Sequence, residues 1–383
     1  MKKTILSLMA IIGMAANASA QEAWKMVVTH HDGTKQEIAV EKISEITYEL
    51  TSGEKPQLEE KNVDQLIIKE LYNGGCLTDD GTSYFQQDGG VVLYNNGAEE
   101  LVVRNLCFGI GDPFNAQAPF ADWRQDGKLI YEDEDVEYIP AIHGIWYFPE
   151  ALTIPGYSQV VVAIHGGVDH TITYKNSVDY ANPDYYVMYD PESGYNNSRY
   201  YPTPSDVIPT SHYLKAVEYG MGNGWTLSVT SPALFIFHMD NDPGEYAMNP
   251  ENIIYAPGQD ASPVNANLRV YKDWIIDGFE EFSNDYLQSS QKRLPASIDA
   301  GYVGFTFRQG HSVYRNVDKE ATLAIPGNAE KLVYGYSMGV TDGDPSGIDA
   351  EASIKNGAKI VYLDDNNSST DFHERQAFSV RGK

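Results

Sequence analysis

The sequence has little cysteine and few basic residues for its length. Its 383 residues include two cysteines, and 27 lysines and arginines stand against 54 aspartates and glutamates, which gives a formal net charge of −27. So acidic a chain repels a phosphate backbone, which argues against nucleic-acid binding. The sequence also lacks a glycine-rich phosphate loop and the His-x-x-x-His and Cys-x-x-Cys spacings, so no nucleotide or zinc motif is indicated.

Long apolar runs are missing beyond the first twenty residues. Met1-Lys2-Lys3 is a basic opening, Ile5 to Ala16 is an apolar core, and Ala18-Ser19-Ala20 is an Ala-x-Ala cleavage signal. This pattern predicts a secretory signal peptide over residues 1–20, and it places the mature protein in the periplasm or outside the cell. The apolar core is shorter than the roughly 20 residues of a membrane-spanning helix, and no later stretch is long enough. We therefore expect no membrane span.

The two cysteines, Cys76 and Cys107, lie at the ends of neighbouring predicted strands. An exported protein can form a disulfide, and we expect either a Cys76–Cys107 bridge or two small buried thiols. Sequence alone leaves both alternatives open, because it does not give the separation of the two Cα atoms.

Helical periodicity is also scarce, and Glu280–Gln291 is the one short helix that we predict. Apolar and β-branched runs bounded by glycine, proline and asparagine predict strands instead. Asn95-Asn96-Gly97 lies between two such runs and favours a hairpin. The main predicted strands are Leu66–Tyr72, Val91–Tyr94, Leu101–Ile110, Ala233–Phe237 and Leu268–Phe279. Strands joined by short polar loops indicate an antiparallel all-β fold.

Several of these segments resemble one family. Leu66–Tyr72, the Leu93-Tyr94-Asn95 strand and the Ile154-Pro155-Gly156 segment resemble the opening parts of lamin-tail-like domains. Gly310-His311-Ser312-Val313-Tyr314-Arg315 and the string from Asp364 to Phe372 resemble their closing segments. The closest resemblance is to an uncharacterised Bacteroidetes branch with long insertions, described as a domain of unknown function. The resemblance implies an immunoglobulin-like β-sandwich over about residues 64–383.

The chain is therefore expected to have four parts. The signal peptide of residues 1–20 is followed by a small N-terminal β unit over residues 21–50, in which Asp32-Gly33 favours a hairpin turn. Residues 51–63 are polar, include Gly53 and Pro56, and predict a linker. Residues 64–383 form the lamin-tail-like β-sandwich with long loop insertions.

A tyrosine-rich segment from Tyr174 to Tyr219 is the most unusual part of the sandwich sequence. It has no helical period and predicts a long excursion from the sandwich. Tyr195, Tyr200 and Tyr201 lie in its most polar part, and we expect them to be exposed. Exposed tyrosines can bind a sugar or a protein partner, whereas packing of the loop onto the sandwich is the plainer explanation.

Two further motifs are candidates for chemistry. Gly335-Tyr336-Ser337-Met338-Gly339 matches the nucleophile elbow of serine hydrolases, but Val340 to Pro345 cannot promptly start the helix that an elbow requires. Asp342 and Asp344 resemble the first half of a calcium loop, and Asp240 and Asp242 form a similar fragment. Such acidic loops are more often only turns. Calcium is thus the one cofactor that the sequence suggests.

These observations predict an exported, non-catalytic binding or adhesion accessory of the bacterial envelope. The resemblance and the compartment also suggest a capture accessory for a TonB-dependent outer-membrane uptake receptor, with haem, a metal complex or a glycan as its ligand. A serine hydrolase that uses Ser337 is a third hypothesis. The partner is then an envelope protein, an outer-membrane receptor or a glycan.

Overall fold

The computed structural model describes residues 25–29, 35–42, 58–117 and 123–381. The chain divides into two compact units, Met1–Pro56 and Gln57–Lys383. In the first unit, strand β1 (Lys25–Thr29) pairs antiparallel with β2 (Lys35–Ala39), and the turn η1 (Val40–Lys42) follows. The predicted Asp32-Gly33 turn lies outside the described residues. The second unit begins at Gln57, and the backbone of Lys61 already exchanges hydrogen bonds with Val102.

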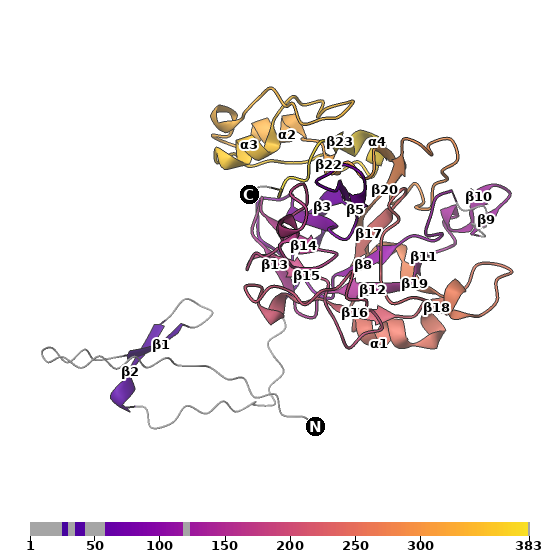
Figure 1. Ribbon diagram of the computed structural model, residues 1–383, viewed down its shortest axis with the longest axis horizontal. Coiled ribbons are helices and arrows are strands. Elements are labelled where there is room, and N and C mark those ends of the chain that lie inside the picture. The colour runs from indigo at the N-terminus through magenta and orange to yellow at the C-terminus, as the bar shows by residue number, and fades with distance from the viewer. Residues whose placement is uncertain (1–24, 30–34, 43–57, 118–122, 382–383) are drawn as a thin grey trace, which may run out of the picture. The chain divides into compact units, whose positions relative to one another are not determined.

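Two six-stranded sheets form the second unit (Figure 1). The first sheet runs in the order β15 (Tyr186–Val187), β14 (Gln159–Ala163), β6 (Gly90–Asn95), β3 (Leu66–Tyr72), β22 (Ser312–Arg315) and β23 (Phe372–Arg375). The second runs in the order β16 (Lys215–Glu218), β12 (Gly144–Tyr147), β8 (Cys107–Ile110), β17 (Ala233–Phe237), β20 (Ile275–Ser283) and β21 (Val303–Phe305). Most neighbouring strands are antiparallel, and β14–β15 and β20–β21 are parallel.

The main core lies between these sheets. Leu66, Ile68 and Leu71 of β3 pack there with Phe279 of β20 and Phe372 of β23, and all five are at most 5% exposed. The pairing of β3 with β6 shifts between Ile68 and Glu70, which marks a β-bulge. The bulge lets Leu71 return to the core although two charged residues precede it. The prediction of an all-β sandwich is confirmed.

Smaller sheets and short helices surround the sandwich. The smaller sheets pair β13 (Leu152–Ile154) with β7 (Leu101–Val103), β4 (Cys76–Leu77) with β5 (Tyr84–Phe85), β9 (Arg124–Gln125) with β10 (Lys128–Leu129), and β19 (Asn267–Tyr271) with both β11 (Tyr138–Ile142) and β18 (Ile253–Ile254). The helices are α1 (Pro243–Met248), α2 (Lys319–Ala324), α3 (Ala350–Lys355) and α4 (Ser368–Asp371). The 3-10 turns are η2 (Val63–Gln65), η3 (Ile130–Glu132), η4 (His170–Ile172), η5 (Thr210–His212), η6 (Pro250–Asn252), η7 (Pro263–Asn265), η8 (Lys272–Trp274) and η9 (Ala329–Lys331). Among the described residues, no helix has the length and apolar character needed to cross a membrane.

Three predicted elements differ from the structure. The run Leu101–Ile110 is two strands, and the first of them pairs with β13, so Asn95-Asn96-Gly97 does not close a β6–β7 hairpin. The run Leu268–Phe279 is broken by η8 into β19 and β20, which belong to different sheets. The predicted helix Glu280–Gln291 is wrong, because β20 continues through Glu280 and Glu281 to Ser283. Both glutamates are buried, and partners on other elements offset the cost for Glu280.

Candidate functional site

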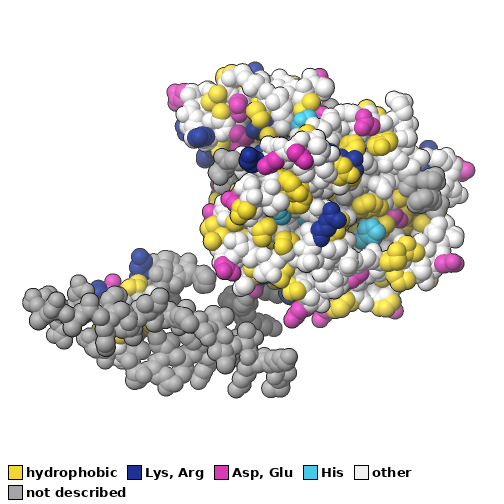
Figure 2. Space-filling view, in the orientation of Figure 1, with side chains coloured by type: hydrophobic (Ala, Val, Ile, Leu, Met, Phe, Trp, Pro, Cys, Tyr) yellow, Lys and Arg dark blue, Asp and Glu magenta, His cyan; other side chains and the backbone are white. Residues whose placement is uncertain are grey.

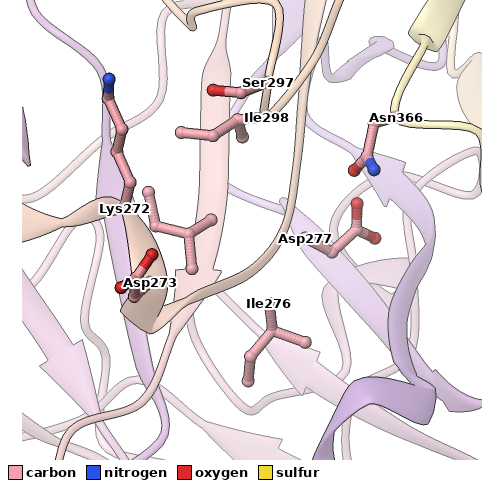
Figure 3. Close-up of a pocket in the computed structure, with 8 residues that line it drawn as sticks. Lys272, Asp273, Ile276, Asp277, Ser297, Ile298 and Asn366 are labelled. Atoms are coloured by element: carbon pink, nitrogen blue, oxygen red, sulfur yellow. The ribbon is translucent and has the colours of Figure 1, made fainter. Parts of the chain in front are cut away.

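A cavity of about 360 Å³ opens on the second unit beside strand β20 (Figure 3). Its lining comes from three places: the turn η8 and the start of β20, the loop after Pro295, and the loop before α4. The lining residues are Lys272, Asp273, Ile275, Ile276, Asp277, Ser297, Ile298 and Asn366. The volume falls in the range of pockets that hold small molecules.

Asp277 is the buried polar residue of the cavity, with 3% of its surface exposed. It lies on β20 with its carboxyl turned toward the first sheet, where Oδ2 accepts the backbone N–H of Ile68 at 2.7 Å. Oδ2 also accepts a bond from Arg315, and Oδ1 accepts the backbone N–H of Gly278 at 2.8 Å. Burial raises the pKa of Asp277 to about 7, and the charge of Arg315 opposes that rise.

Arg315 joins three elements around this cavity. From β22 its guanidinium bonds Asp277 on β20, and its Nε donates to the carbonyl of Ile68 on β3 at 2.9 Å. Its Nη1 donates to the carbonyl of Leu363 at 2.8 Å and to the Asp364 carboxylate at 2.9 Å. The planar guanidinium with five N–H groups suits such a junction. Arg315 therefore fixes both the cavity carboxyl and the loop on the opposite wall.

That loop carries Asn366, which has a positive φ of 50°. Asn367 caps α4 by accepting the N–H of Ser369, and Asp371 accepts the N–H groups of Asp365 and Asn367 at 3.0 and 3.1 Å. The backbone of Asn366 is held in turn, because its carbonyl accepts the N–H of Ala300 at 2.7 Å. Figure 3 shows that its amide points toward the carboxyl of Asp277.

The third wall is the loop that holds Ser297 and Ile298. The Glu280 carboxylate anchors it from β20, with bonds from the N–H groups of Arg293 and Leu294 at 2.7 and 2.6 Å. Although burial opposes the change, Lys292 and Arg293 lower the pKa of Glu280, so this carboxylate is charged at neutral pH. Ile298 is buried and Ser297 is exposed, which puts the serine at the cavity entrance.

Lys272 and Asp273 complete the lining from η8. The Lys272 ammonium donates to the carbonyl of Asp133 at 3.2 Å, and in Figure 3 it points away from Asp277. Asp273 is exposed. The cavity thus presents carboxyl, amide and hydroxyl groups beside isoleucine side chains. Such a lining can form several hydrogen bonds to a ligand while covering an apolar part of it.

The expectation of exposed tyrosines is wrong for Tyr195 and Tyr201, which are 2% and 5% exposed. Both rings pack against Trp146, at centroid distances of 5.9 and 5.4 Å, and the Tyr201 hydroxyl donates to the carbonyl of Trp225 at 2.8 Å. Tyr200 is half-buried against His165. The segment therefore folds back onto the core, because large aromatic rings gain more from burial than from exposure. The structure gives these tyrosines a packing role.

The calcium candidates do not come together. Asp344 is buried, and its oxygens accept the N–H groups of Val317 and Ser346 at 2.9 and 2.8 Å, whereas Asp342 is exposed. Asp242 caps α1 by accepting the N–H of Glu245, and Asp240 is exposed. Within the described ranges, no group of three or more His, Cys, Asp or Glu residues is placed to hold a metal ion.

Cys76 and Cys107 are free and buried. The bridge that we considered is therefore not formed, and the alternative of two small buried thiols describes them. Cys107 lies on β8 and packs in the cluster behind the second sheet, whereas Cys76 lies on β4, outside both large sheets. Burial raises the pKa of the Cys76 thiol to about 12, which leaves it protonated.

Ser337 is exposed on a loop and does not form a nucleophile elbow. Gly335 has a positive φ of 88°, and no helix begins after Gly339 before α3 at Ala350. The imidazole in this region, that of His373, bonds to the hydroxyl of the neighbouring Tyr336 at 2.5 Å. The arrangement of strand, sharp turn and helix that aims a serine in hydrolases is absent from residues 332–349.

Sequence reasoning missed the cavity residues as a site. It selected the strings that contain Arg315 and Asn366 for their resemblance to a family, without a role for either residue. The available signal was a charged residue next to apolar strand residues, as in Ile275-Ile276-Asp277 and Val313-Tyr314-Arg315. A charge that a strand buries needs a partner elsewhere in the fold. Local sequence patterns do not identify Asp277 and Arg315 as partners.

Comparison with known proteins gives a family and a fold. The family model described as "Protein of unknown function (DUF4876)" matches residues 154–379. The crystal structure of a DUF4876 family protein from Bacteroides thetaiotaomicron is similar, with a TM-score of 0.55 and 18% identity over 81% of this chain and 70% of that chain. At this identity the likeness concerns the fold alone. No curated protein matches the chain. The family match covers more than half of the sequence, and the chain belongs to the DUF4876 family.

Proposed function

We propose that this protein is an exported, non-catalytic binding accessory of the bacterial envelope, and that it holds its ligand in the cavity beside Asp277. The observation that carries the proposal is the construction of this cavity. Buried ion pairs on β20 and β22 hold its walls, and the polar groups of Asn366, Ser297 and Asp273 are left to face a ligand. A preformed, rigidly supported pocket suits recognition.

The bonds of Asp277 favour binding over catalysis. A general base must reach a proton of its substrate, but both oxygens of Asp277 already accept backbone N–H groups, and one also accepts Arg315. We further propose the compartment and the finer architecture that the sequence suggests: cleavage of residues 1–20, release into the periplasm or beyond, and a lamin-tail-like arrangement of the sandwich. Adhesion and capture for a TonB-dependent outer-membrane receptor would both use such a site.

A stability assay with a ligand panel tests this function. Mature protein would be melted, with far-ultraviolet circular dichroism as the readout, in the presence of haem, ferric complexes, calcium and neutral oligosaccharides. A ligand that binds only the folded protein raises the melting temperature. We expect at least one class to do so in the wild type.

Two tryptophan variants locate the binding. Ser297→Trp places a large side chain at the cavity entrance, and Ala296→Trp places the same side chain at an exposed neighbour that does not line the cavity. The ligand-induced rise should persist in Ala296→Trp and disappear in Ser297→Trp. An equal rise in both variants, or no rise with any panel member, would contradict the proposal.

A further inference from the structure

The lining of the cavity limits the class of ligand that it can take. This inference rests on the proposed function, since it concerns the occupant of the same cavity. The charges of the lining are arranged against an anion: the Asp273 carboxylate is exposed, and the charge of Asp277 is paired with Arg315. The one cation of the lining, Lys272, donates to the carbonyl of Asp133 and points away from Asp277 in Figure 3. The chain as a whole carries a net charge of −27. An anionic ligand would enter against this field.

Haem and bare metal ions fit poorly for a different reason. Haem iron takes its axial ligand from His, Met, Cys or Tyr, and none of these residues lines the cavity. A hard cation needs several free oxygens, but the Asp277 oxygens accept three N–H groups from Ile68, Gly278 and Arg315. Of the two carboxylates in the lining, that of Asp273 accepts no such bond from any residue that the structure describes.

Neutral hydroxyl groups match the lining in both of their hydrogen-bonding roles. A hydroxyl can donate to the Asp273 carboxylate, accept from the Asn366 amide, and do either with Ser297. Ile276 and Ile298 offer apolar surface for the C–H groups of a ring. A volume of about 360 Å³ limits the buried part of the ligand to a small molecule or to one end of a larger one.

We infer that the cavity binds a neutral, hydroxyl-rich ligand, namely a sugar residue, with Asn366, Asp273 and Ser297 as its recognition residues. Asp277 and Arg315 act as positioning residues, because they hold the strand and the loop that carry the recognising groups. Ser297, Asp273 and Asn366 are exposed, so the entrance can accommodate a chain attached to the bound residue.

Calorimetric titration of the mature protein with matched sugars tests the inference. The probes are glucose, galactose and N-acetylglucosamine, a neutral oligosaccharide of each, and glucuronate as the acidic analogue. At least one neutral probe should bind, and glucuronate should bind at least tenfold more weakly than glucose if glucose is a ligand. A free sugar and a glycan chain are distinguished directly, because a preference for the oligosaccharide identifies a glycan end as the ligand.

Asn366→Gly is the sharpest variant, because glycine accommodates the positive φ of 50° while the side chain that carries the amide is removed. It should weaken binding about tenfold, as expected for one lost hydrogen bond to a ligand. Asn62→Gly is the matched control, since Asn62 also has a positive φ, 56°, and its side chain bonds Glu100 away from the cavity. The control should leave affinity unchanged.

The outcomes separate the two proposals. Binding of a neutral sugar that Ser297→Trp abolishes and Asn366→Gly weakens supports both. Binding of haem, a ferric complex or glucuronate that Ser297→Trp abolishes, with no binding of any neutral sugar, overturns the ligand class and leaves the binding function intact. Absence of any binding that depends on Ser297 overturns both.

Discussion

Single buried charges decide much of this structure, and Arg315 is the most connected of them. Its side chain is 1% exposed, and it bonds Ile68, Asp277, Leu363 and Asp364. Those partners belong to β3, β20 and the loop before α4. Because β3 and β20 contribute apolar side chains to the core and the loop lines the cavity, losing the arginine should affect both the fold and the cavity.

Arg315→Met keeps the apolar stem and removes the charge. It leaves the Asp277 carboxyl buried without its cation, and breaking a buried pair in this way typically costs about 3–5 kcal/mol of unfolding free energy. Urea titration would measure this loss. Lys61→Met is the control, because the Lys61–Glu100 pair is half exposed and should contribute at most about 1 kcal/mol. A loss at Arg315 no larger than that at Lys61 would refute this role for the arginine.

Glu281 is a buried carboxyl that has no cation beside it among the residues the structure describes. It is 1% exposed on β20, its Oε1 has no hydrogen-bond partner, and burial and then the nearby Glu374 raise its pKa well above 4.5. Glu374 itself accepts the N–H of Thr306 and the imidazole of His311. The pKa of Glu281 is thus higher in the folded protein than in the unfolded chain. Its contribution to stability is fully present below the unfolded-state pKa and is lost as pH rises through the folded-state pKa.

Glu281→Gln should therefore stabilise the protein more as pH increases. The gain is expected to begin above pH 4.5 and to grow by up to about 1.4 kcal/mol per pH unit until the folded pKa is passed. Unfolding free energies of both proteins at pH 5, 6.5 and 8 would show it. The prediction fails if the difference in unfolding free energy between Glu281→Gln and the wild type is no larger at pH 8 than at pH 5.

At this scale the sequence predicted residue environments poorly. Tyr195 and Tyr201 stand among serines and asparagines, and local polarity indicated exposure, but both rings pack against Trp146 of β12, and the backbone carbonyl of Trp225 accepts the Tyr201 hydroxyl. Asp277 follows two isoleucines, and nothing in that string names Arg315 as its partner. Both errors concern contacts between positions far apart in the chain, which local patterns do not specify.

At the scale of elements, the segment that carries α2 and α3 covers the outer face of β3, β6 and β22 (Figure 1). Lys69 fixes it in place. This residue lies on the same outer face of β3 as Ile67, and its ammonium lies 5.2–5.9 Å from the ring centroids of Tyr94, Tyr314 and Tyr362. It also bonds Glu351 of α3 at 2.6 Å. The lysine is fully buried, so these contacts are poorly screened by solvent.

Lys69→Met should destabilise this covering segment more than it destabilises the sandwich. The substitution removes the cation–π contacts and the ion pair with Glu351, at an expected cost of about 3 kcal/mol. Hydrogen exchange should then become faster in residues 317–362 than in β6 or β17. Lys355→Met, at the end of α3, is the control and should leave exchange unchanged. Uniformly faster exchange throughout the second unit would instead show that the segment and the sandwich unfold together.

The sequence located strands better than it located their partners. Leu66–Tyr72 and Ala233–Phe237 were predicted with the bounds that β3 and β17 have, because short apolar runs with β-branched and aromatic residues favour buried strands. Asn95-Asn96-Gly97 suggested a hairpin, but Asn95 bonds the carbonyls of Glu99 and Ile154, and the chain leaves the sheet there. Turn chemistry predicts where a strand ends, and tertiary contacts decide which strand comes next.

At the scale of the molecule, the few basic residues are placed unevenly. Part of the positive charge is paired with groups inside the protein, because four basic side chains are buried: Lys69, Arg293, Arg315 and Arg375. On the face in Figure 2, acidic side chains are scattered over the second unit and do not form one patch. With 54 acidic residues in the chain, mutual repulsion across this surface should oppose the folded state.

Salt should therefore stabilise the protein. Raising sodium chloride from roughly 10 mM to roughly 500 mM shortens the screening distance several-fold and should raise the urea midpoint. Glu134 and Asp135 are exposed, and within residues 58–117 and 123–381 no side-chain hydrogen bond or ion pair of either is found. The double variant Glu134→Lys/Asp135→Lys therefore lowers the negative charge without removing such a contact. We expect it to gain about 0.5–1 kcal/mol at low salt and almost nothing at high salt. A midpoint that falls with salt, or a gain that survives high salt, would mean that surface repulsion does not limit the stability of this acidic sandwich.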